Sequence, residues 1–276
     1  MSTCAPAALF MPCEPAKAPL VIAHRGASGI VPENTCLALS TAMDLGADMV
    51  EVDVQLSRDG YPVIFHDWHL ARARCSAQYS REALKSLGIG DLSLRELKQL
   101  DVGSWKHRKF AGLPIPTLAE VLSLCEEKIA LNLEVKIPST GDETRVRHAM
   151  IDQLGEALAC YPSPESVLIS SFDGQVLELA RAVFPASPLG ILPQQAGLRE
   201  TIRLADRLNA FSVHLRCVSI RPAIVKSIRE SGVRLYAYTA DRTQTFKRLI
   251  AAGVDGIFTN FPDRMIALKD PLPRSR

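Results

Sequence analysis

The sequence predicts an α/β protein with the (β/α)8 architecture of a TIM barrel. Short apolar segments rich in β-branched residues alternate with segments of helical periodicity along most of the 276 residues, a pattern typical of a parallel sheet. Eight predicted strands favour a closed barrel, because one such domain takes ~250 residues. No G-x-G-x-x-G pattern follows the first strand, which disfavours an open dinucleotide-binding sheet.

The predicted strands are short runs in which apolar and β-branched residues dominate. They comprise residues 20–24, 49–54, 129–135, 166–169, 188–192, 210–214, 233–238 and 255–258. Apolar residues at helical spacing predict helices at residues 33–45, 117–126, 143–160, 173–184, 198–208, 221–230 and 243–252. Gly46, Gly232 and Gly253 stand where three of these helices end, as expected for left-handed C-terminal caps.

One insertion interrupts the alternation after the second strand region. The turn signal Arg58-Asp59-Gly60 precedes a short extra strand at 63–65, and residues 68–116 form a long excursion with one predicted helix at 94–100. Long connections of this kind are often functional. The proline-rich residues 1–19 predict an irregular leader, so we expect a single barrel domain over residues 20–270.

Composition argues against several other classes of protein. The 32 basic and 30 acidic residues leave a net charge of only +2, whereas nucleic-acid-binding proteins usually carry a clustered basic face, so no nucleic-acid partner is expected. Seven scattered cysteines without a C-x-x-C pattern disfavour a disulfide framework and favour a cytoplasmic protein. No apolar run approaches the ~20 residues that span a bilayer, so stable membrane insertion is not expected. The oligomeric state is left open.

Charged residues mark the second and third predicted strands. Because alternate residues of a strand share a face, the apolar residues there occupy one face, and Glu51, Asp53, Glu134 and Lys136 occupy the other. If the apolar faces meet the helices, these four side chains point into the mouth of the barrel, where the active sites of such folds lie.

Three converging carboxylates repel one another, and a hard divalent cation such as Mg2+ or Ca2+ resolves that conflict. The sequence therefore predicts a cation at Glu51, Asp53 and Glu134. The alternative is that Glu134 pairs with Lys136 and the other two carboxylates are solvated.

Two histidines also stand at predicted strand ends. His24 precedes Arg25, and His66 follows the extra strand. Imidazole transfers protons near neutral pH, so the two residues are candidates for a base and an acid on opposite sides of a phosphorus atom. Arg25 has the planar donor geometry of a phosphate ligand, and Lys136 could add a second positive charge.

With these residues the chain resembles the glycerophosphodiester phosphodiesterase family of the bacterial cytosolic type, from Leu20 to about Asp263. The matching motifs, in order, are His24-Arg25-Gly26, Pro32-Glu33-Asn34-Thr35, Glu51-Val52-Asp53-Val54, His66-Asp67, the stretch 112–118, Leu133-Glu134-Val135-Lys136, Ser170-Ser171-Phe172 and the stretch 253–260. The first motif alone is weak, but the ordered set is specific.

The resemblance implies metal-dependent hydrolysis of small glycerophosphodiesters to sn-glycerol 3-phosphate and an alcohol, in glycerophospholipid catabolism. It implies Glu51, Asp53 and Glu134 as ligands of one Mg2+ or Ca2+, His24 and His66 as the acid–base pair, and Arg25 and Lys136 as phosphate ligands. Glu33 is a further candidate for the metal or its water.

Other residues leave alternatives open. His214 could contact substrate or be structural, and Tyr238 and Asn260 stand where the family usually carries Trp and Asp, which affects the leaving-group preference. Trp68 and Trp105 could pack a choline group or pack within their loop. The basic residues Arg72, Arg74 and Arg81 predict a solvated face.

Two alternative functions follow from the same residues. One is a lysophospholipase D, which would need an apolar groove or a membrane-facing patch. The other is a barrel that binds phosphodiesters without turnover, against which the presence of both His24 and His66 argues. Because one fold carries many functions, the decision depends on the site.

Overall fold

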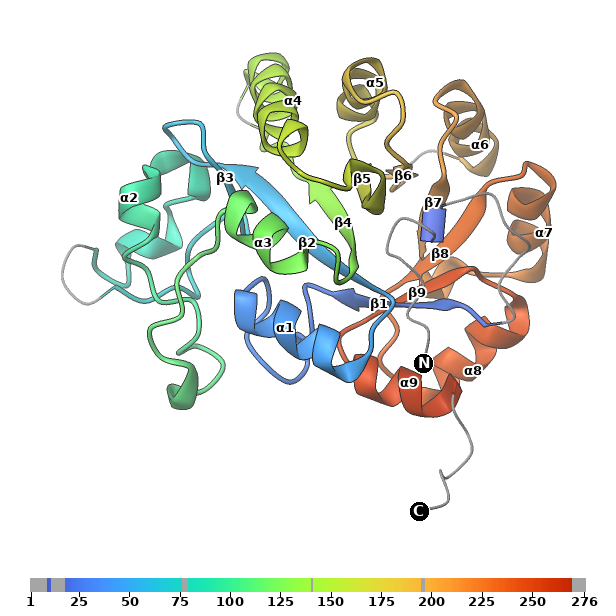
Figure 1. The fold of residues 1–276 in the computed structure, drawn as a ribbon, viewed down its shortest axis with the longest axis horizontal. Coiled ribbons are helices and arrows are strands. Elements are labelled where there is room, and N and C mark those ends of the chain that lie inside the picture. Colours follow the sequence, from blue (N-terminus) through green and yellow to red (C-terminus); the bar gives the residue numbers. More distant parts are fainter. Residues whose placement is uncertain (1–8, 11–17, 76–78, 140, 195–196, 270–276) are drawn as a thin grey trace.

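A computed structural model describes residues 9–10, 18–75, 79–139, 141–194 and 197–269. Its centre is a closed barrel of eight parallel strands in the order β1-β2-β4-β5-β6-β7-β8-β9, with β9 pairing back onto β1 (Figure 1). The strands are β1 Leu20–His24, β2 Met49–Leu56, β4 Ala130–Val135, β5 Val167–Ser171, β6 Leu189–Ile191, β7 Ser212–Arg216, β8 Arg234–Tyr238 and β9 Gly256–Thr259. The predicted (β/α)8 architecture is confirmed.

Helices form a ring around the barrel (Figure 1). They are α1 Cys36–Leu45, α3 Leu118–Cys125, α4 Glu143–Ala159, α5 Gly174–Val183, α6 Leu198–Arg207, α7 Pro222–Glu230, α8 Thr243–Ala252 and α9 Pro262–Lys269. Helix α9 was not predicted, because it is short and buries only Pro262 and Met265. Helix α1 starts at Cys36 because the Thr35 side chain accepts a hydrogen bond from the Ala38 amide.

Strand alternation divides the core into two parts. Residues such as Val21, Val50 and Leu133 face the helices, whereas Ile22 and Met49 lie in the interior of the barrel. Both sets are fully buried. The interior-facing set continues toward the carboxyl ends of the strands as polar residues. The charged side chains thus lie at the mouth of the barrel, and an apolar cluster fills the interior beneath them.

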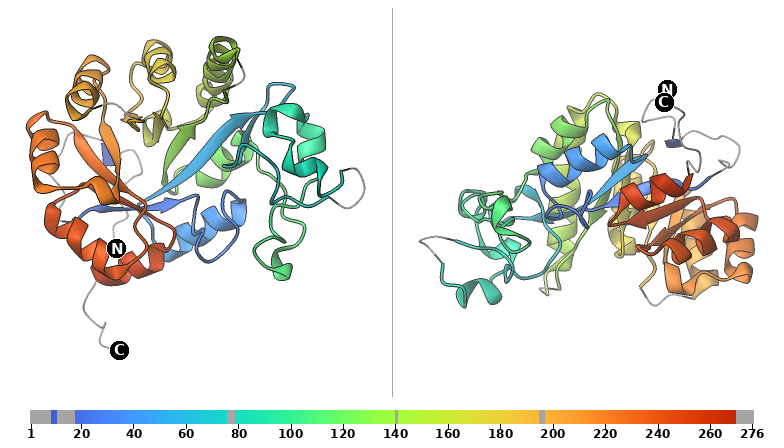
Figure 2. Two further views of the ribbon diagram at one scale, coloured as in Figure 1. Left: turned by 180° about the vertical axis from the view of Figure 1, so that it is seen from behind. Right: turned by 90° about the horizontal axis from the view of Figure 1, so that it is seen from below.

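The excursion forms a separate lobe beside β2, outside the ring of helices (Figures 1 and 2). The short strand β3 Pro62–Ile64 pairs antiparallel with β2, and α2 Leu94–Leu97 ends three residues before the predicted helix end. The lobe has its own apolar core, which includes Phe65, Leu70 and Ile89. Its 3-10 helices are Ala83–Lys85, Ile89–Asp91 and Arg108–Phe110; two others, Pro164–Ser166 and Cys217–Ser219, lie in the barrel loops.

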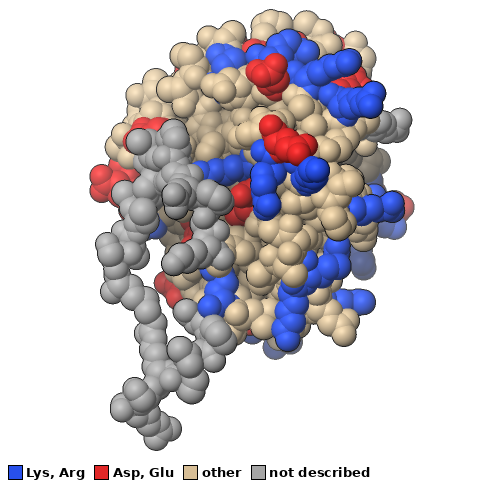
Figure 3. Space-filling view, turned by 90° about the vertical axis from the view of Figure 1, so that its right-hand side faces the viewer, with Lys and Arg blue, Asp and Glu red and all other residues tan. Residues whose placement is uncertain are grey.

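The face made by α6, α7 and α8 is basic. These helices carry Lys or Arg at seven positions and Asp or Glu at three, and Lys and Arg side chains project from this side of the molecule in Figure 3. Among the described helices, none combines the length and apolar character needed to cross a membrane.

Gly26 lies in the turn after β1 and packs against α1. Its φ is +76°, and a Cβ there would lie 2.5 Å from the Ala38 carbonyl carbon. Gly46 also has a positive φ, +87°, but a Cβ there would meet no atom within 4 Å. Substitution of Gly46 therefore tests backbone strain alone, whereas substitution of Gly26 tests strain and steric overlap together.

We expect Gly46→Ala to lower the free energy of unfolding by about 1 kcal/mol through left-handed strain alone. Gly26→Ala should lower it by about 3 kcal/mol or more, because overpacking adds to the strain. Denaturant unfolding of both variants measures the difference, and equal losses would contradict the predicted overlap with α1.

Candidate functional site

A cavity of about 470 Å3 opens at the carboxyl ends of the barrel strands. One wall contains most of the predicted site residues, and the other contains apolar residues and one further cation. The cavity is lined by His24, Arg25, Glu51, His66, Glu134, Lys136, Phe172, Leu192, Arg216, Cys217, Val218, Tyr238, Thr239 and Phe258. The cavity thus brings six predicted residues together at the strand ends, where the sequence predicts the site: His24, Arg25, Glu51, His66, Glu134 and Lys136.

The carboxylates of Glu51, Asp53 and Glu134 form one cluster. Their closest oxygens lie within 4.8 Å of one another, because Asp53 and Glu134 are paired in register and Glu51 precedes Asp53 on the same face of β2. Glu51 and Asp53 are each only 1% exposed. This burial without enough positive charge is the arrangement that a bound cation stabilises.

The pKa values of the cluster reflect that conflict. Burial raises the pKa of Glu51 well above its ordinary value, and the charges of Asp53 and Glu134 add to the rise. Burial and Asp53 raise the pKa of Glu134 to about 7. Burial would also raise the pKa of Asp53, but Arg25 and Lys136 outweigh it and lower the value. Among the described residues, Glu51 Oε1 has no hydrogen-bond partner, so a ligand position is free.

This donor set fits a hard divalent cation, which prefers carboxylate oxygens. A second group, Glu33, His66 and Asp67, is also close enough to hold an ion. Its carboxylates, however, already accept hydrogen bonds from Arg72 at 2.7 Å and 2.6 Å. The cluster of Glu51, Asp53 and Glu134 is therefore the group that could hold a cation.

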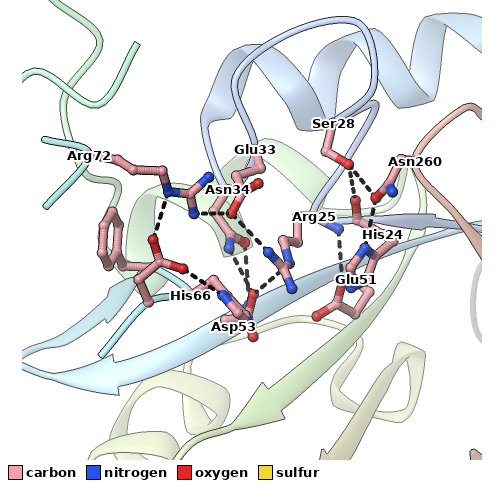
Figure 4. Close-up of polar contacts among 12 residues, drawn as sticks. His24, Arg25, Ser28, Glu33, Asn34, Glu51, Asp53, His66, Arg72 and Asn260 are labelled. Atoms are coloured by element: carbon pink, nitrogen blue, oxygen red, sulfur yellow. Dashed lines mark hydrogen bonds and ion pairs between the residues drawn. The ribbon is translucent and has the colours of Figure 1, made fainter. Parts of the chain in front are cut away.

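Arg25 borders the cluster in Figure 4, and Lys136 also reaches it. The Arg25 amide donates to Glu51 Oε2 at 2.8 Å, and its Nε lies 3.3 Å from Asp53 Oδ2. Lys136 Nζ lies 3.5 Å from Asp53 Oδ1. Arg25 adopts a positive φ of 58°, which turns both its amide and its guanidinium toward the carboxylates.

His24 is held in one tautomer by the loop after β9. Its Nδ1 lies 2.8 Å from Asn260 Oδ1, and the Asn260 amide donates from Nδ2 to Asp241 Oδ2 at 2.7 Å. A carboxylate only accepts, so the amide nitrogen must face Asp241 and the amide oxygen must face His24. Neutral His24 therefore carries its proton on Nδ1. Burial, reinforced by Arg25, lowers the pKa of His24 to about 4.

His66 has a different partner. Its Nδ1 donates to Asp67 Oδ1 at 2.8 Å, and Asp67 Oδ2 accepts from Arg72 Nε at 2.6 Å. Arg72 also donates to Glu33 Oε1 and stacks 4.5 Å from the centre of the Trp105 ring. The expectation that Arg72 belongs to a solvated basic face is therefore wrong: it joins the excursion to the site (Figure 4).

Glu33 supports the two arginines and does not reach the carboxylate cluster. Its Oε1 accepts from Arg25 at 2.9 Å and from Arg72 at 2.7 Å. The neighbouring residue Asn34 instead contacts the cluster directly, since its Nδ2 donates to Asp53 Oδ2 at 2.8 Å. Sequence reasoning assigned no role to Asn34.

His214 does not line the cavity, contrary to the expectation that it ends its strand. Strand β7 continues to Arg216, so His214 lies one inward-facing position deeper and is fully buried. Its ring stacks on Tyr236 at 5.2 Å, and its Nε2 lies 2.8 Å from Ser212 Oγ. Arg216 occupies the position at the mouth.

Tyr238 lies in the cavity, with Phe172 packed edge-on at 6.4 Å between ring centres. Trp68 presents its ring to Lys136 Nζ at 5.0 Å, and Trp105 presents its ring to Arg72. One face of each tryptophan therefore meets a cation of the protein itself.

Arg216, Arg72, Asn34 and Asp241 are the residues that sequence reasoning missed as parts of this region. The exact end of β7 would have identified Arg216, since residues 212, 214 and 216 share one face. Nothing in the sequence alone connects Asp241 with His24.

Comparisons with known proteins identify the family of this chain. The sequence model of the glycerophosphoryl diester phosphodiesterase family matches residues 24–264. A glycerophosphodiester phosphodiesterase of Caldanaerobacter subterraneus subsp. tengcongensis is 38% identical over 250 residues, which are 90% of this chain and 97% of the relative. One from Bacillus subtilis is 31% identical, with 88% and 84% covered.

A solved structure is also similar. It shows an Oleispira antarctica phosphodiesterase in complex with its product sn-glycerol 3-phosphate, at 32% identity and a TM-score of 0.80. The match covers 92% of this chain and 97% of that one. The full length of the barrel is therefore shared.

The carboxylate cluster predicts a measurable cation affinity. We expect Mg2+ or Ca2+ to raise the thermal midpoint of the wild-type protein, because a ligand of the folded state stabilises it. Glu51→Gln should weaken the binding at least about tenfold, through the loss of one charged ligand. Calorimetric titration measures the affinity.

Glu156→Gln, at an exposed position of α4, provides a control with the same change in charge. Identical cation affinity in Glu51→Gln and in the control would exclude Glu51 as a ligand.

Proposed function

The chain belongs to the glycerophosphoryl diester phosphodiesterase family, and it is a phosphodiesterase by that membership; we propose that it hydrolyses small glycerophosphodiesters to sn-glycerol 3-phosphate and an alcohol. One observation carries the proposal. His24, His66, Arg25 and Lys136 meet a buried carboxylate cluster in one cavity at the mouth of the barrel. That set supplies proton transfer, anion binding and cation binding in one place.

Arg25 and Lys136 are proposed to bind the phosphodiester. Both cations line the cavity, and both are paired with the cluster through Asp53. A divalent cation held by Glu51, Asp53 and Glu134 would neutralise phosphoryl oxygens and polarise a hydroxyl group. With the carboxylates so compensated, the guanidinium and ammonium groups are available to the substrate.

The different partners of the two histidines suggest their roles. Neutral His24 has a free lone pair on Nε2, which lies 3.9 Å from Glu51, so it is placed to take a proton from a hydroxyl beside the cluster. His66 donates from Nδ1 to the Asp67 carboxylate, which orients its Nε2 away from Asp67, toward the space where a leaving alcohol would need a proton. We therefore propose His24 as the base and His66 as the acid that protonates the leaving alcohol.

A second candidate function is the cleavage of lysophospholipids. Phe172 and Val218 line the cavity and are 37% and 72% exposed, and Trp68 nearby is 46% exposed. Exposed apolar residues beside a site favour an apolar ligand. Release of choline from lysophosphatidylcholine, measured beside glycerophosphocholine, separates the two functions.

A cytoplasmic location is part of the proposal. Cys36, Cys75, Cys125, Cys160 and Cys217, the five cysteines among the described residues, form no disulfide. Free thiols are typical of a reducing compartment.

The assay that tests the proposal measures sn-glycerol 3-phosphate released from glycerophosphocholine and glycerophosphoethanolamine with Mg2+, with Ca2+ and with EDTA. We expect release only with a divalent cation. His24→Ala and His66→Ala should each lower kcat about 10^2- to 10^4-fold, the usual contribution of acid–base catalysis.

His148→Ala is the matched control, because His148 is exposed on α4 and bonds only to the Thr144 carbonyl. Thermal melts confirm that each variant is folded. Full activity of folded His24→Ala or His66→Ala would refute that residue's role.

Arg72 is proposed as a positioning residue for His66. We expect Arg72→Ala to lower kcat about tenfold or more, since it removes charge-assisted hydrogen bonds to Asp67 and Glu33. KM should change less, because Arg72 does not line the cavity. Arg72→Lys should restore little of the lost kcat, since one ammonium group cannot replace the planar guanidinium that bonds both Asp67 and Glu33.

The readout is the pH profile of kcat, together with the ratio of kcat to KM effects. Arg81→Ala, an exposed arginine of the same lobe, is the control. A purely structural role of Arg72 would lower the melting temperature and leave the pH profile of the folded enzyme unchanged.

A further inference from the structure

We propose that Arg216 forms a subsite for a negatively charged leaving group, so that the enzyme prefers glycerophosphodiesters whose alcohol arm carries an anionic group such as a carboxylate. This inference rests on the proposed function and deepens it. It concerns the carboxyl end of β7, where His214 was expected and Arg216 is found.

Arg216 lies across the barrel from the carboxylate cluster. In the closed order of eight strands, β7 is four strands away from β2 in either direction, so the two strands face each other. Ser212, His214 and Arg216 alternate inward along β7, and Arg216 is the last of them, paired in register with Tyr238. The side chain lines the cavity that contains His24, Glu134 and Lys136.

The charge of Arg216 is not compensated by the protein. Among the residues that the structure describes, no hydrogen bond or ion pair to its guanidinium is found within the usual distances, and the residue is exposed. Its neighbours in the cavity wall are Leu192, Cys217, Val218 and Tyr238, none of which carries a negative charge. By contrast, Arg25, Arg72 and Lys136 all contact carboxylates.

Tyr238 connects the two walls. Burial raises the pKa of its hydroxyl, with the charge of Glu134 adding to the rise and that of Arg216 opposing it. The hydroxyl therefore remains a neutral donor. Together with the Arg216 guanidinium it offers donors to an anion.

The Trp68 ring, one candidate surface for a cationic leaving group, already faces Lys136 Nζ at 5.0 Å. The acidic residues that line the cavity, Glu51 and Glu134, belong to the proposed metal site. Helices α6, α7 and α8 lie on the β7 side of the barrel (Figure 1), and the basic face that they make (Figure 3) adds positive potential, which salt screens beyond ~8 Å.

The test compares glycerophosphoserine with glycerophosphoethanolamine, whose leaving alcohols share an ammonium group and differ by one carboxylate. Wild-type kcat/KM should be higher for the serine compound. Arg216→Ala should lower the ratio of the two kcat/KM values about tenfold, and Arg216→Glu should lower it further, because the attraction becomes repulsion. Arg216→Lys should retain part of the preference.

Arg221→Ala removes the same charge from the exposed start of α7, outside the cavity, and should leave the ratio at the wild-type value. Raising the salt concentration should reduce the wild-type ratio toward that of Arg216→Ala. Circular dichroism and thermal melts establish that the variants fold.

Two results would overturn the subsite. One is a wild-type preference for glycerophosphoethanolamine. The other is an unchanged ratio in folded Arg216→Ala; if both kcat/KM values fall equally, Arg216 acts on the glycerol or phosphate arm. Turnover of both substrates with either of these results leaves the proposed function intact. Absence of turnover of either substrate with Mg2+ or Ca2+ would overturn the proposed function and the subsite with it.

Discussion

The buried carboxylates of Glu51, Asp53 and Glu134 are the constraint on which the rest of the site depends. Three such groups within 4.8 Å at the ends of two paired strands cannot all stay charged without compensation. Arg25 reaches two of them through its amide and its guanidinium, and Asn34 holds Asp53 in place. Arg25 and Gly26 both have a positive φ, and the tight turn that they form places these donors beside the cluster.

The excursion after β3 completes the site and is not a passive insertion. Arg72 connects Asp67 with Glu33, and the Lys106 ammonium donates to the Ser28 carbonyl in the loop after β1. The lobe thus contacts both segments that carry the histidines. Because it also has its own apolar core, it can hold His66 rigidly against the barrel. This rigidity favours the geometry that proton transfer requires.

The cavity is electrostatically asymmetric. On the side of β1, β2 and β4 each cation has a carboxylate partner, so this wall is matched to a metal and a phosphate. On the side of β7 and β8, Arg216 stands among apolar and aromatic residues with its charge available. Since the diester has two arms, this difference would let one scaffold keep its chemistry while the opposite wall selects the leaving group.

The sequence by itself determined the barrel and the charged residues on one wall of its mouth. Strand alternation is local, so the inward faces of Glu51, Asp53 and Glu134 could be predicted from the pattern, and so could the two histidines at strand ends. The tertiary structure decided what each residue contacts. The hydrogen bonds from Asp241 through Asn260 to His24, and those of Arg72 with Asp67 and Glu33, join segments that are distant in the sequence. The presence of Arg216 at the mouth depends on where β7 ends. Such pairings and strand ends are settled by packing, which no local pattern encodes.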